Sequence, residues 1–181
     1  MKKLLLGCKD LNRRAQREMV NHLSPYLYAI CCRYTPNKED AKDLMQESLI
    51  LIFNNIKQCT SNEEYSFKAW CKRIAINTAL SKKRKKGFQM EVIKIVEMQQ
   101  AVPPIVQSQL NVEDILKLLN FLPENQRLVF NLAIIDGYTH KEIAEILAIK
   151  ESSSRTFLTR ARASLQASLQ KDWTVKKTNG I

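Results

Sequence analysis

Residues 139–162 read THKEIAEILAIKESSSRTFLTRAR, and this stretch predicts a helix, a tight turn and a second, longer helix. Thr139 and Glu142 form a T-x-x-E capping box, which marks the start of a helix. Apolar side chains recur at helical spacing and define one buried face across both segments: Ile143, Ala144, Leu147, Ile149, Leu158 and Ala161. Three arginines remain for the outer side of the second helix: Arg155, Arg160 and Arg162. Two helices joined by so short a turn can place the second helix in a DNA major groove, so the stretch predicts a DNA-reading module.

The composition of the chain is basic and favours helices. The 181 residues carry 29 Lys and Arg against 18 Asp and Glu, a net charge of +11, and 45% of them are hydrophobic. Only four glycines and five prolines argue against a loop-rich β protein. Residues 1–88 hold 18 basic and 8 acidic side chains, whereas residues 89–181 hold 11 and 10. This excess fits a polyanionic partner, although charge alone leaves a merely basic protein as the alternative.

Several kinds of site have no signature in the sequence. Five cysteines make an odd number without a C-x-x-C pair, and His22 and His140 stand apart, so we expect no metal and no other cofactor. The cysteines indicate reduced, partly buried thiols in a cytoplasmic protein. The sequence shows neither a convincing carboxylate pair nor a phosphate-binding glycine loop, so we do not expect an enzyme. The apolar run in MKKLLLGC is too short for an export signal, and no stretch approaches the roughly 20 apolar residues of a spanning helix, so membrane insertion is not expected.

Two helices in the first half are expected to carry binding surfaces. Asn37 predicts the cap of a helix over about 38–58. One face of that helix gathers three acceptor-bearing side chains within one turn: Asp43, Gln46 and Glu47. Their chemistry fits a solvated surface and a partner-docking patch equally well. The next helix opens at Phe67 and runs into five consecutive cations at 82–86, which phosphate groups would neutralise, a flexible basic tail being the alternative.

Helix-breaking residues and a change in composition predict how the chain is divided into helices and domains. Residues 8–34 are predicted to be helical, with a break or restart at Ser24-Pro25. Residues 88–110 are Gln-rich, contain two consecutive prolines and predict a linker with a short helical piece near 90–99. Helices resume after the linker, and Gly137 is expected to end the one before the capping box. We therefore predict an all-α protein of two small helical domains, 1–87 and 111–175, joined by a flexible linker over 88–110, with the helix-turn-helix in the second domain.

Three motifs, in order along nearly the whole chain, resemble a known family. DAKDLMQESLILIF at 40–53 is similar to a D-A-x-D-L-x-Q-E-x-F helix, and FKAWCKRIAINTALSKKRKK at 67–86 to an F-x-x-W-L-x-R-I-A-x-N helix. LPENQRLVFNLAIIDGYTHKEIAEIL at 122–147, with the following SSSRTFLTRAR, resembles the second domain of the same family. The family is that of bacterial RNA polymerase sigma factors of the extracytoplasmic-function class. One helix-turn-helix alone is weak evidence, but three motifs at the right separations are strong evidence.

The resemblance implies a dissociable subunit without catalysis, which binds core RNA polymerase and directs it to promoter DNA. It also implies an anti-sigma factor as a regulating partner. Asp43, Gln46 and Glu47 match the family positions that bind the clamp helices of the largest polymerase subunit. The loop at 60–66 matches the segment that catches an extruded base of the minus-ten element. The candidate minus-ten contacts are Lys72, Arg73, Asn77, Lys83 and Arg84. The candidate minus-thirty-five contacts are Ser153, Arg155, Thr156, Thr159 and Arg160.

Some positions depart from the family pattern. Ala148 and Lys150 stand where the family often has Gly and Ser in the turn, and Ile76 and Ser81 where many members carry Arg and Asp. These departures bear on promoter contacts and not on the fold. A stand-alone helix-turn-helix regulator that never contacts polymerase is the alternative function, but it leaves the acidic face and the basic first half unexplained.

Overall fold

The computed structural model describes the backbone of residues 1–60, 63–85 and 112–178, and helices account for most of it. Side chains within these ranges are described except at 84–85, 112–113 and 170–178. The chain divides into two compact units, Met1–Phe88 and Gln89–Ile181. The prediction of an all-α protein with two helical domains is confirmed. The predicted linker at 88–110, with its short helical piece, lies outside the described residues.

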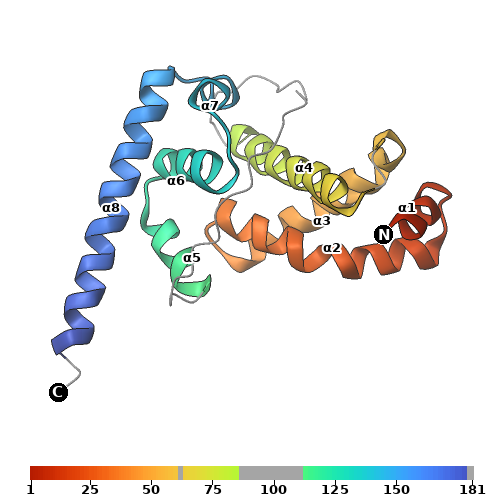
Figure 1. Ribbon diagram of the computed structural model, residues 1–181, viewed down its shortest axis with the longest axis horizontal. Helices are drawn as coiled ribbons and strands as arrows, with labels where there is room; N and C mark the ends of the chain where they lie inside the picture. The colour runs from red at the N-terminus through yellow and green to blue at the C-terminus, as the bar shows by residue number, and fades with distance from the viewer. Residues whose placement is uncertain (61–62, 86–111, 179–181) are drawn as a thin grey trace. The chain divides into compact units, whose positions relative to one another are not determined.

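The described part of the first unit, residues 1–60 and 63–85, contains four helices and one 3₁₀ turn. These are α1 (Lys2–Lys9), α2 (Arg13–Tyr34), α3 (Lys38–Asn55), η1 (Ile56–Gln58) and α4 (Glu64–Lys85). Helices α2, α3 and α4 pack against one another in pairs, and α1 packs on α2 and η1 (Figure 1). Their shared core contains Leu23, Leu27, Leu44, Ile52, Phe67 and Leu80, all nearly or fully excluded from solvent. Each such side chain contributes about 1.5–3 kcal/mol when fully buried, so this core holds the three long helices together.

The helix predicted over 8–34 is interrupted at 10–12, where α1 has ended and α2 has not yet begun. Leu11 has a φ of 60°, in the left-handed region. The N–H groups of Leu11 and Asn12 donate to the carbonyls of Cys8 and Gly7 at 3.1 and 3.0 Å, which closes α1 with a Schellman motif. The Asn12 side chain then caps α2 by accepting from the N–H groups of Arg14 and Ala15. Periodicity missed this junction because Leu11 has the spacing of a core residue, whereas it is 66% exposed in the structure.

The predicted helix break at Ser24-Pro25 is wrong, because α2 continues through Pro25. Pro25 is exposed, whereas Leu23 and Leu27 on either side of it are fully buried. The Ser24 hydroxyl donates to the Val20 carbonyl at 2.7 Å within the same turn. Packing of one continuous apolar face therefore outweighs the backbone hydrogen bond that proline removes.

The predicted helix starts in the first unit are close to the observed ones. Asn37 caps α3 as predicted, with the Asp40 N–H donating to its side chain at 2.7 Å. Helix α4 begins at Glu64, three residues before the predicted start at Phe67. The Phe67 ring is buried and stacks against Trp70 at 6.0 Å between ring centroids. This aromatic pair fixes the first turns of α4 on the core of the unit.

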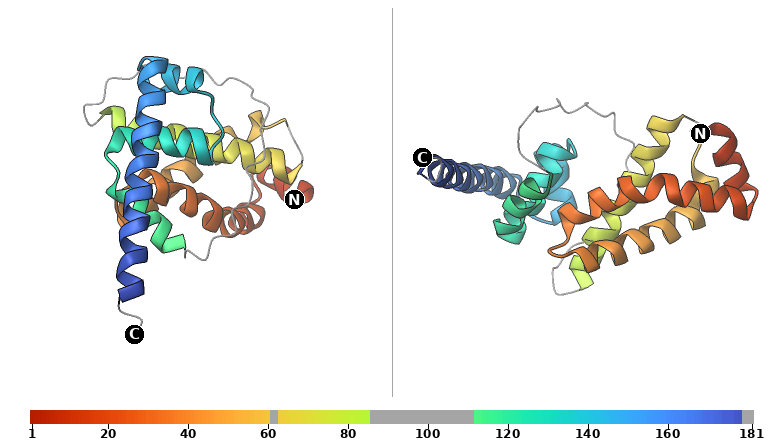
Figure 2. Two further views of the ribbon diagram at one scale, coloured as in Figure 1. Left: turned by 60° about the vertical axis from the view of Figure 1, so that its left-hand side comes forward. Right: turned by 90° about the horizontal axis from the view of Figure 1, so that it is seen from below.

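The described part of the second unit, residues 112–178, contains four helices and a turn of π-helix. These are α5 (Val112–Phe121), α6 (Glu124–Phe130), η2 (Asn131–Ile135), α7 (His140–Leu147) and α8 (Glu151–Thr178). The long helix α8 contacts α5, α6 and α7 (Figure 2). A small core cluster of this unit contains Leu119, Leu122 and Ala161, with Phe130, Ile135 and Leu165 packed against it. Helix α8, the second helix of the helix-turn-helix, therefore also packs on the other helices of this unit.

The chain leaves α6 through the π-turn and then reverses direction at Gly137. The N–H groups of Asp136 and Tyr138 donate to the carbonyls of Asn131 and Leu132, both at 2.9 Å. Gly137 has a φ of 82°, which confirms it as the predicted end of the helix. This reversal places Thr139 at the start of α7.

All five cysteines are free thiols; four are buried, and Cys32 is half-buried. Burial raises the pKa of Cys31 to about 12. Within the described helices, we find none that combines the length and the apolar character needed to cross a membrane.

Candidate nucleic-acid and partner interfaces

Helices α7 and α8 form the predicted helix-turn-helix, joined by a turn of three residues, 148–150. The buried apolar residues of the pair are Ile143, Ile146, Leu147, Leu158 and Ala161. Ile146 was not among the predicted core residues, and Ala144 and Ile149 are only half-buried. The buried face therefore lies slightly to one side of the predicted one, and it leaves the outer side of α8 exposed.

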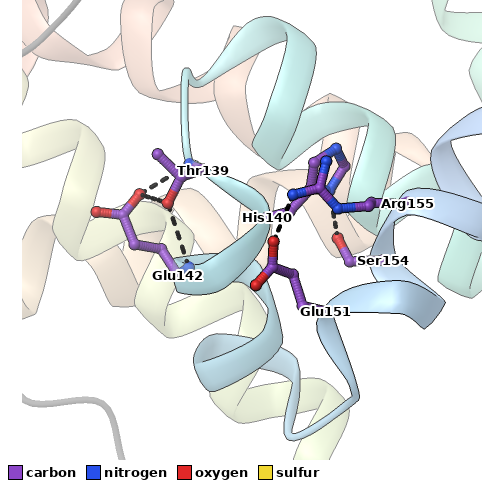
Figure 3. A network of polar contacts seen from close by, with 6 residues as sticks. All are labelled: Thr139, His140, Glu142, Glu151, Ser154 and Arg155. Atoms are coloured by element: carbon purple, nitrogen blue, oxygen red, sulfur yellow. Dashed lines mark hydrogen bonds and ion pairs between the residues drawn. The ribbon is translucent and has the colours of Figure 1, made fainter.

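The start of α7 is fixed by the predicted capping box (Figure 3). The Glu142 N–H donates to the Thr139 hydroxyl oxygen at 3.3 Å, and the Thr139 N–H donates to the Glu142 carboxylate at 2.7 Å. The Thr139 hydroxyl also donates to that carboxylate at 2.8 Å. Both orphan N–H groups are thereby satisfied, which makes α7 a well-defined first helix of the motif.

A polar contact that the sequence did not reveal joins the two helices. His140 Nδ1 lies 2.8 Å from the Ser154 hydroxyl, and Ser154 is fully buried (Figure 3). The contact connects the first turn of α7 with the first turn of α8, and therefore fixes their crossing. No spacing rule pairs residues 14 positions apart, so only the fold could show it.

The turn between α7 and α8 ends the first helix with a Schellman motif. Ala148 has φ 48° and ψ 45°, in the left-handed region. The Ile149 N–H donates to the Ala144 carbonyl at 3.0 Å, and the Ala148 N–H approaches the Glu145 carbonyl at 3.5 Å. The departure noted in the sequence is therefore an alanine in a conformation that glycine adopts without strain.

The predicted minus-thirty-five contacts lie on the outer side of α8. Arg155, Thr156, Thr159 and Arg160 are exposed, and Ser153 is half-buried at the edge of this face. Arg155 forms an ion pair with Glu151 one turn earlier in α8 (Figure 3). This pair holds the guanidinium at the outer surface. Exposed Ser152 lies on the same face and was not predicted.

Although Thr156 and Thr159 are exposed, their hydroxyl groups already donate hydrogen bonds within α8. The Thr156 hydroxyl donates to the Ser152 carbonyl at 2.9 Å, and the Thr159 hydroxyl donates to the Arg155 carbonyl at 3.0 Å. A hydroxyl that already donates inward can offer only its oxygen and its methyl group to a ligand. In this conformation the methyl groups fit an apolar contact with a base better than a hydrogen bond to a phosphate acceptor.

Asp43, Gln46 and Glu47 are all exposed on α3. The exposed face continues along the helix at Ile50, which is 59% exposed. Glu47 also forms an ion pair with Lys82 of α4, at 2.8 Å. The structure therefore leaves the three predicted docking residues accessible and connects one of them to the basic end of α4.

The predicted minus-ten contacts lie along α4. Lys72, Arg73, Asn77 and Lys83 are each half-buried. Arg84 belongs to α4, but its side chain lies outside the described residues. Partial burial fits basic side chains whose stems pack on the helix while their charged heads reach solvent.

Two families of known sequences match this chain, one in each unit. Sigma-70 region 2 matches residues 19–89, and Sigma-70 region 4 matches residues 113–165. Together the two matches span more than half of the chain. The ECF RNA polymerase sigma factor SigW of Bacillus subtilis (strain 168) is 28% identical over 187 residues, with 94% of this chain and 97% of that protein covered.

Solved structures share the fold. The sigma factor RpoE of Bartonella quintana, solved in complex with the anti-sigma factor NepR, has a TM-score of 0.53 and 24% identity, and covers 85% of this chain and 96% of that one. CnrH, solved in complex with the cytosolic domain of CnrY, has a TM-score of 0.51 and 19% identity, and covers 94% of this chain and 97% of that one.

Proposed function

The chain belongs to the sigma-70 family, in its extracytoplasmic-function group, and we propose that it is a dissociable subunit that directs core RNA polymerase to specific promoters. The observation that carries this proposal is the pair of family matches, in order, on two helical units. A stand-alone regulator would account for the helix-turn-helix alone, and the match to region 2 over residues 19–89 gives that alternative no support.

Each exposed surface takes one part of this function. In the proposal, Asp43, Gln46 and Glu47 dock on the polymerase. The basic side of α4, with Lys72, Arg73, Asn77, Lys83 and Arg84, contacts the opened minus-ten strands. The outer face of α8, with Ser153, Arg155, Thr156, Thr159 and Arg160, reads the minus-thirty-five element. Exposure of the α3 and α8 residues supports this division, because each helix buries one side and presents the other.

Three further parts of the proposal follow from the same family. The protein has no catalysis of its own, since it supplies promoter specificity to the polymerase that makes RNA. It acts in the cytoplasm, where that polymerase works. It is controlled by an anti-sigma factor, because structures of the same fold include a sigma factor bound to one.

The test of the function is transcription in vitro with core RNA polymerase on a library of random upstream sequences. We expect transcripts only when the chain is added, from templates that share two short elements at a fixed spacing. Core polymerase alone and the chain alone are the controls. A chain that neither binds core polymerase nor selects templates would overturn the proposal.

The docking face can be tested separately with the double variant Asp43→Ala/Gln46→Ala. Both side chains are exposed, so the fold should survive, while loss of two interface contacts should weaken the affinity for core polymerase by roughly tenfold. Fluorescence anisotropy of labelled chain measures the affinity, and circular dichroism checks the helices. Glu18→Ala removes an exposed acidic side chain from α2 and should bind as the parent does. Unchanged affinity in the double variant would count against this face.

A further inference from the structure

Three exposed arginines stand together at the start of α2: Arg13, Arg14 and Arg17. Arg13 and Arg17 lie one helical turn apart, so their side chains leave the same side of the helix. Among the residues that the structure describes, no carboxylate forms an ion pair with any of the three. Residues 1–18 hold six basic side chains and only two acidic ones, so the neighbouring chain does not neutralise the cluster either. This end of the first unit therefore presents concentrated positive charge.

The position of these arginines is unfavourable for α2 itself. A helix carries a partial positive charge at its N-terminal end, where acidic side chains stabilise it and basic ones destabilise it. The first turn of α2 contains no acidic residue. The Asn12 side chain already caps the helix by accepting from the N–H groups of Arg14 and Ala15, so the guanidinium groups are not needed there. A polyanion bound to the arginines would relieve their repulsion from the helix dipole and from one another.

A nucleic acid fits this surface better than a membrane does. Helices that lie on a membrane bury a continuous apolar face in the lipid. The large apolar side chains exposed within residues 1–18 are Leu6 and Leu11, at 46% and 66%, and two leucines do not form such a face. Phosphate groups, by contrast, pair with a planar guanidinium through two parallel hydrogen bonds. The charge and the chemistry of the cluster therefore match a phosphate backbone.

The cluster lies at the end of the first unit where α4 begins (Figure 1). Helix α1, which is joined to α2 by residues 10–12, packs on η1, which precedes α4 in the chain. Lys9 Nζ also donates to the Cys59 carbonyl at 2.7 Å, which holds α1 there. Helix α4 has 22 residues and is about 33 Å long, and Lys82 and Lys83 lie near its other end. DNA that follows the basic side of α4 toward its first residue would therefore approach the arginines.

We propose that Arg13, Arg14 and Arg17 bind phosphate groups of promoter DNA, as a contact separate from those of α4 and α8. This contact rests on the proposed function. The match to Sigma-70 region 2 begins at residue 19, after the cluster. Phosphate contacts carry no sequence information, so the arginines strengthen binding to all promoters alike, and their contribution falls as the salt concentration rises.

The experiment measures binding of labelled promoter DNA to the full-length chain on core polymerase, by anisotropy at several salt concentrations. We expect Arg13→Gln/Arg17→Gln to weaken binding roughly tenfold at about 0.1 M salt. The slope of log affinity against log salt should become shallower by about 0.9 for each arginine removed, and the loss should be equal on promoters with altered elements. Arg13→Lys/Arg17→Lys keeps both charges and should keep most of the affinity.

Two further measurements separate a DNA contact from other causes. The urea midpoint of Arg13→Gln/Arg17→Gln should rise slightly above that of the parent chain, because two cations leave the start of a helix. Weaker DNA binding by a more stable variant does not come from unfolding. The matched control is Lys38→Gln/Lys42→Gln, which removes two exposed cations at the same spacing from the first turns of α3 and should bind DNA as the parent does.

A parental salt slope in Arg13→Gln/Arg17→Gln would overturn the inference, as would an equal loss in the α3 control, which would indicate a general effect of net charge. Weaker binding of the variant to core polymerase without DNA would assign the arginines to the polymerase instead. Parental binding to phosphatidylserine vesicles that the variant loses, with DNA binding unchanged, would assign them to a membrane surface. Failure of the proposed function is distinguishable, because the parent chain on core polymerase would then select no promoter.

Discussion

Ala148 is the residue at which the local backbone of the helix-turn-helix is most strained. Its φ of 48° places an L side chain in the left-handed region, which costs roughly 1–2 kcal/mol. Glycine avoids this cost but loses more entropy on folding, by about 0.4–1 kcal/mol. We therefore expect Ala148→Gly to raise the free energy of unfolding by about 0.5–1 kcal/mol.

Urea unfolding followed by circular dichroism measures this change. Ala144→Gly is the matched control, because residue 144 lies inside α7, where glycine should destabilise by about 1 kcal/mol. If both substitutions destabilise the chain, the turn does not carry the strain that its backbone angle indicates.

Arg155 is the residue for which base reading can be tested most directly. Its guanidinium is exposed on α8 and forms an ion pair with Glu151, and an exposed arginine can form paired hydrogen bonds with a guanine. We expect Arg155→Ala to cost about 1–3 kcal/mol at one particular base pair of the minus-thirty-five element.

Binding of short duplexes, each with one base pair changed, measures this discrimination. Arg162→Ala removes another exposed arginine of α8 and serves as the control. An equal loss on all duplexes would identify Arg155 as a phosphate contact that carries no sequence information.

At the residue scale, the sequence predicted what depends on near neighbours. The Thr139–Glu142 box, the Asn37 cap and the Gly137 stop are each set by side chains within a few positions. The contact between His140 and Ser154 could not be predicted, because it requires the crossing of α7 and α8 to be known. The inward hydrogen bonds of the threonines also depend on rotamers that no spacing rule gives.

At the scale of elements, the errors arose where packing overrides local preference. Pro25 lies within α2 because the apolar face on either side of it is continuous. The end of α1 was missed because Leu11, and not glycine, adopts the left-handed conformation there. Local signals therefore placed most helices, whereas their exact joints depended on tertiary contacts.

The contact between the Glu64 carboxylate of α4 and His22 of α2, 3.4 Å long, should be sensitive to acid, as should the ion pair of Glu64 with Lys68. The hydrogen bond from Lys68, followed by the contact with His22, lowers the pKa of the Glu64 carboxyl. A lowered folded-state pKa means that Glu64 stabilises the fold above its unfolded-state pKa and that this stabilisation is lost as the pH falls through its folded-state pKa. We therefore expect the difference in urea midpoint between the parent chain and Glu64→Gln to be largest near neutral pH and to shrink below about pH 4.

Circular dichroism across this pH range provides the measurement. Glu18→Gln removes a carboxylate that is exposed on α2 and should leave the pH dependence of the parent unchanged. A pH-independent difference between the parent and Glu64→Gln would mean that the Glu64 carboxylate does not stabilise the folded chain.

At the scale of the whole molecule, the sequence predicted the two domains, but not the contact between the proposed docking face of α3 and the basic end of α4. The linker composition at 88–110 and three ordered motifs predicted two helical domains, and the two family matches agree with that order. The ion pair between Glu47 and Lys82 joins a proposed docking residue to the basic end of α4. It could not be predicted, because it depends on how α3 and α4 pack.

The Glu47–Lys82 pair should couple polymerase binding to DNA binding. A polymerase cation that pairs with the Glu47 carboxylate would release the Lys82 ammonium to bind a DNA phosphate. By linkage, DNA binding at Lys82 would then strengthen polymerase binding by the same factor. Both side chains are partly exposed, so the pair is worth about 0.2–1 kcal/mol, and the coupling is at most about fivefold. We therefore expect promoter DNA to raise the affinity of the parent for core polymerase by more than it raises that of Lys82→Gln, measured by anisotropy with and without DNA.

Lys42→Gln, which breaks the α3 pair with Glu39, is the control and should keep the parental coupling. Equal coupling in the parent and in Lys82→Gln would show that the two surfaces act independently.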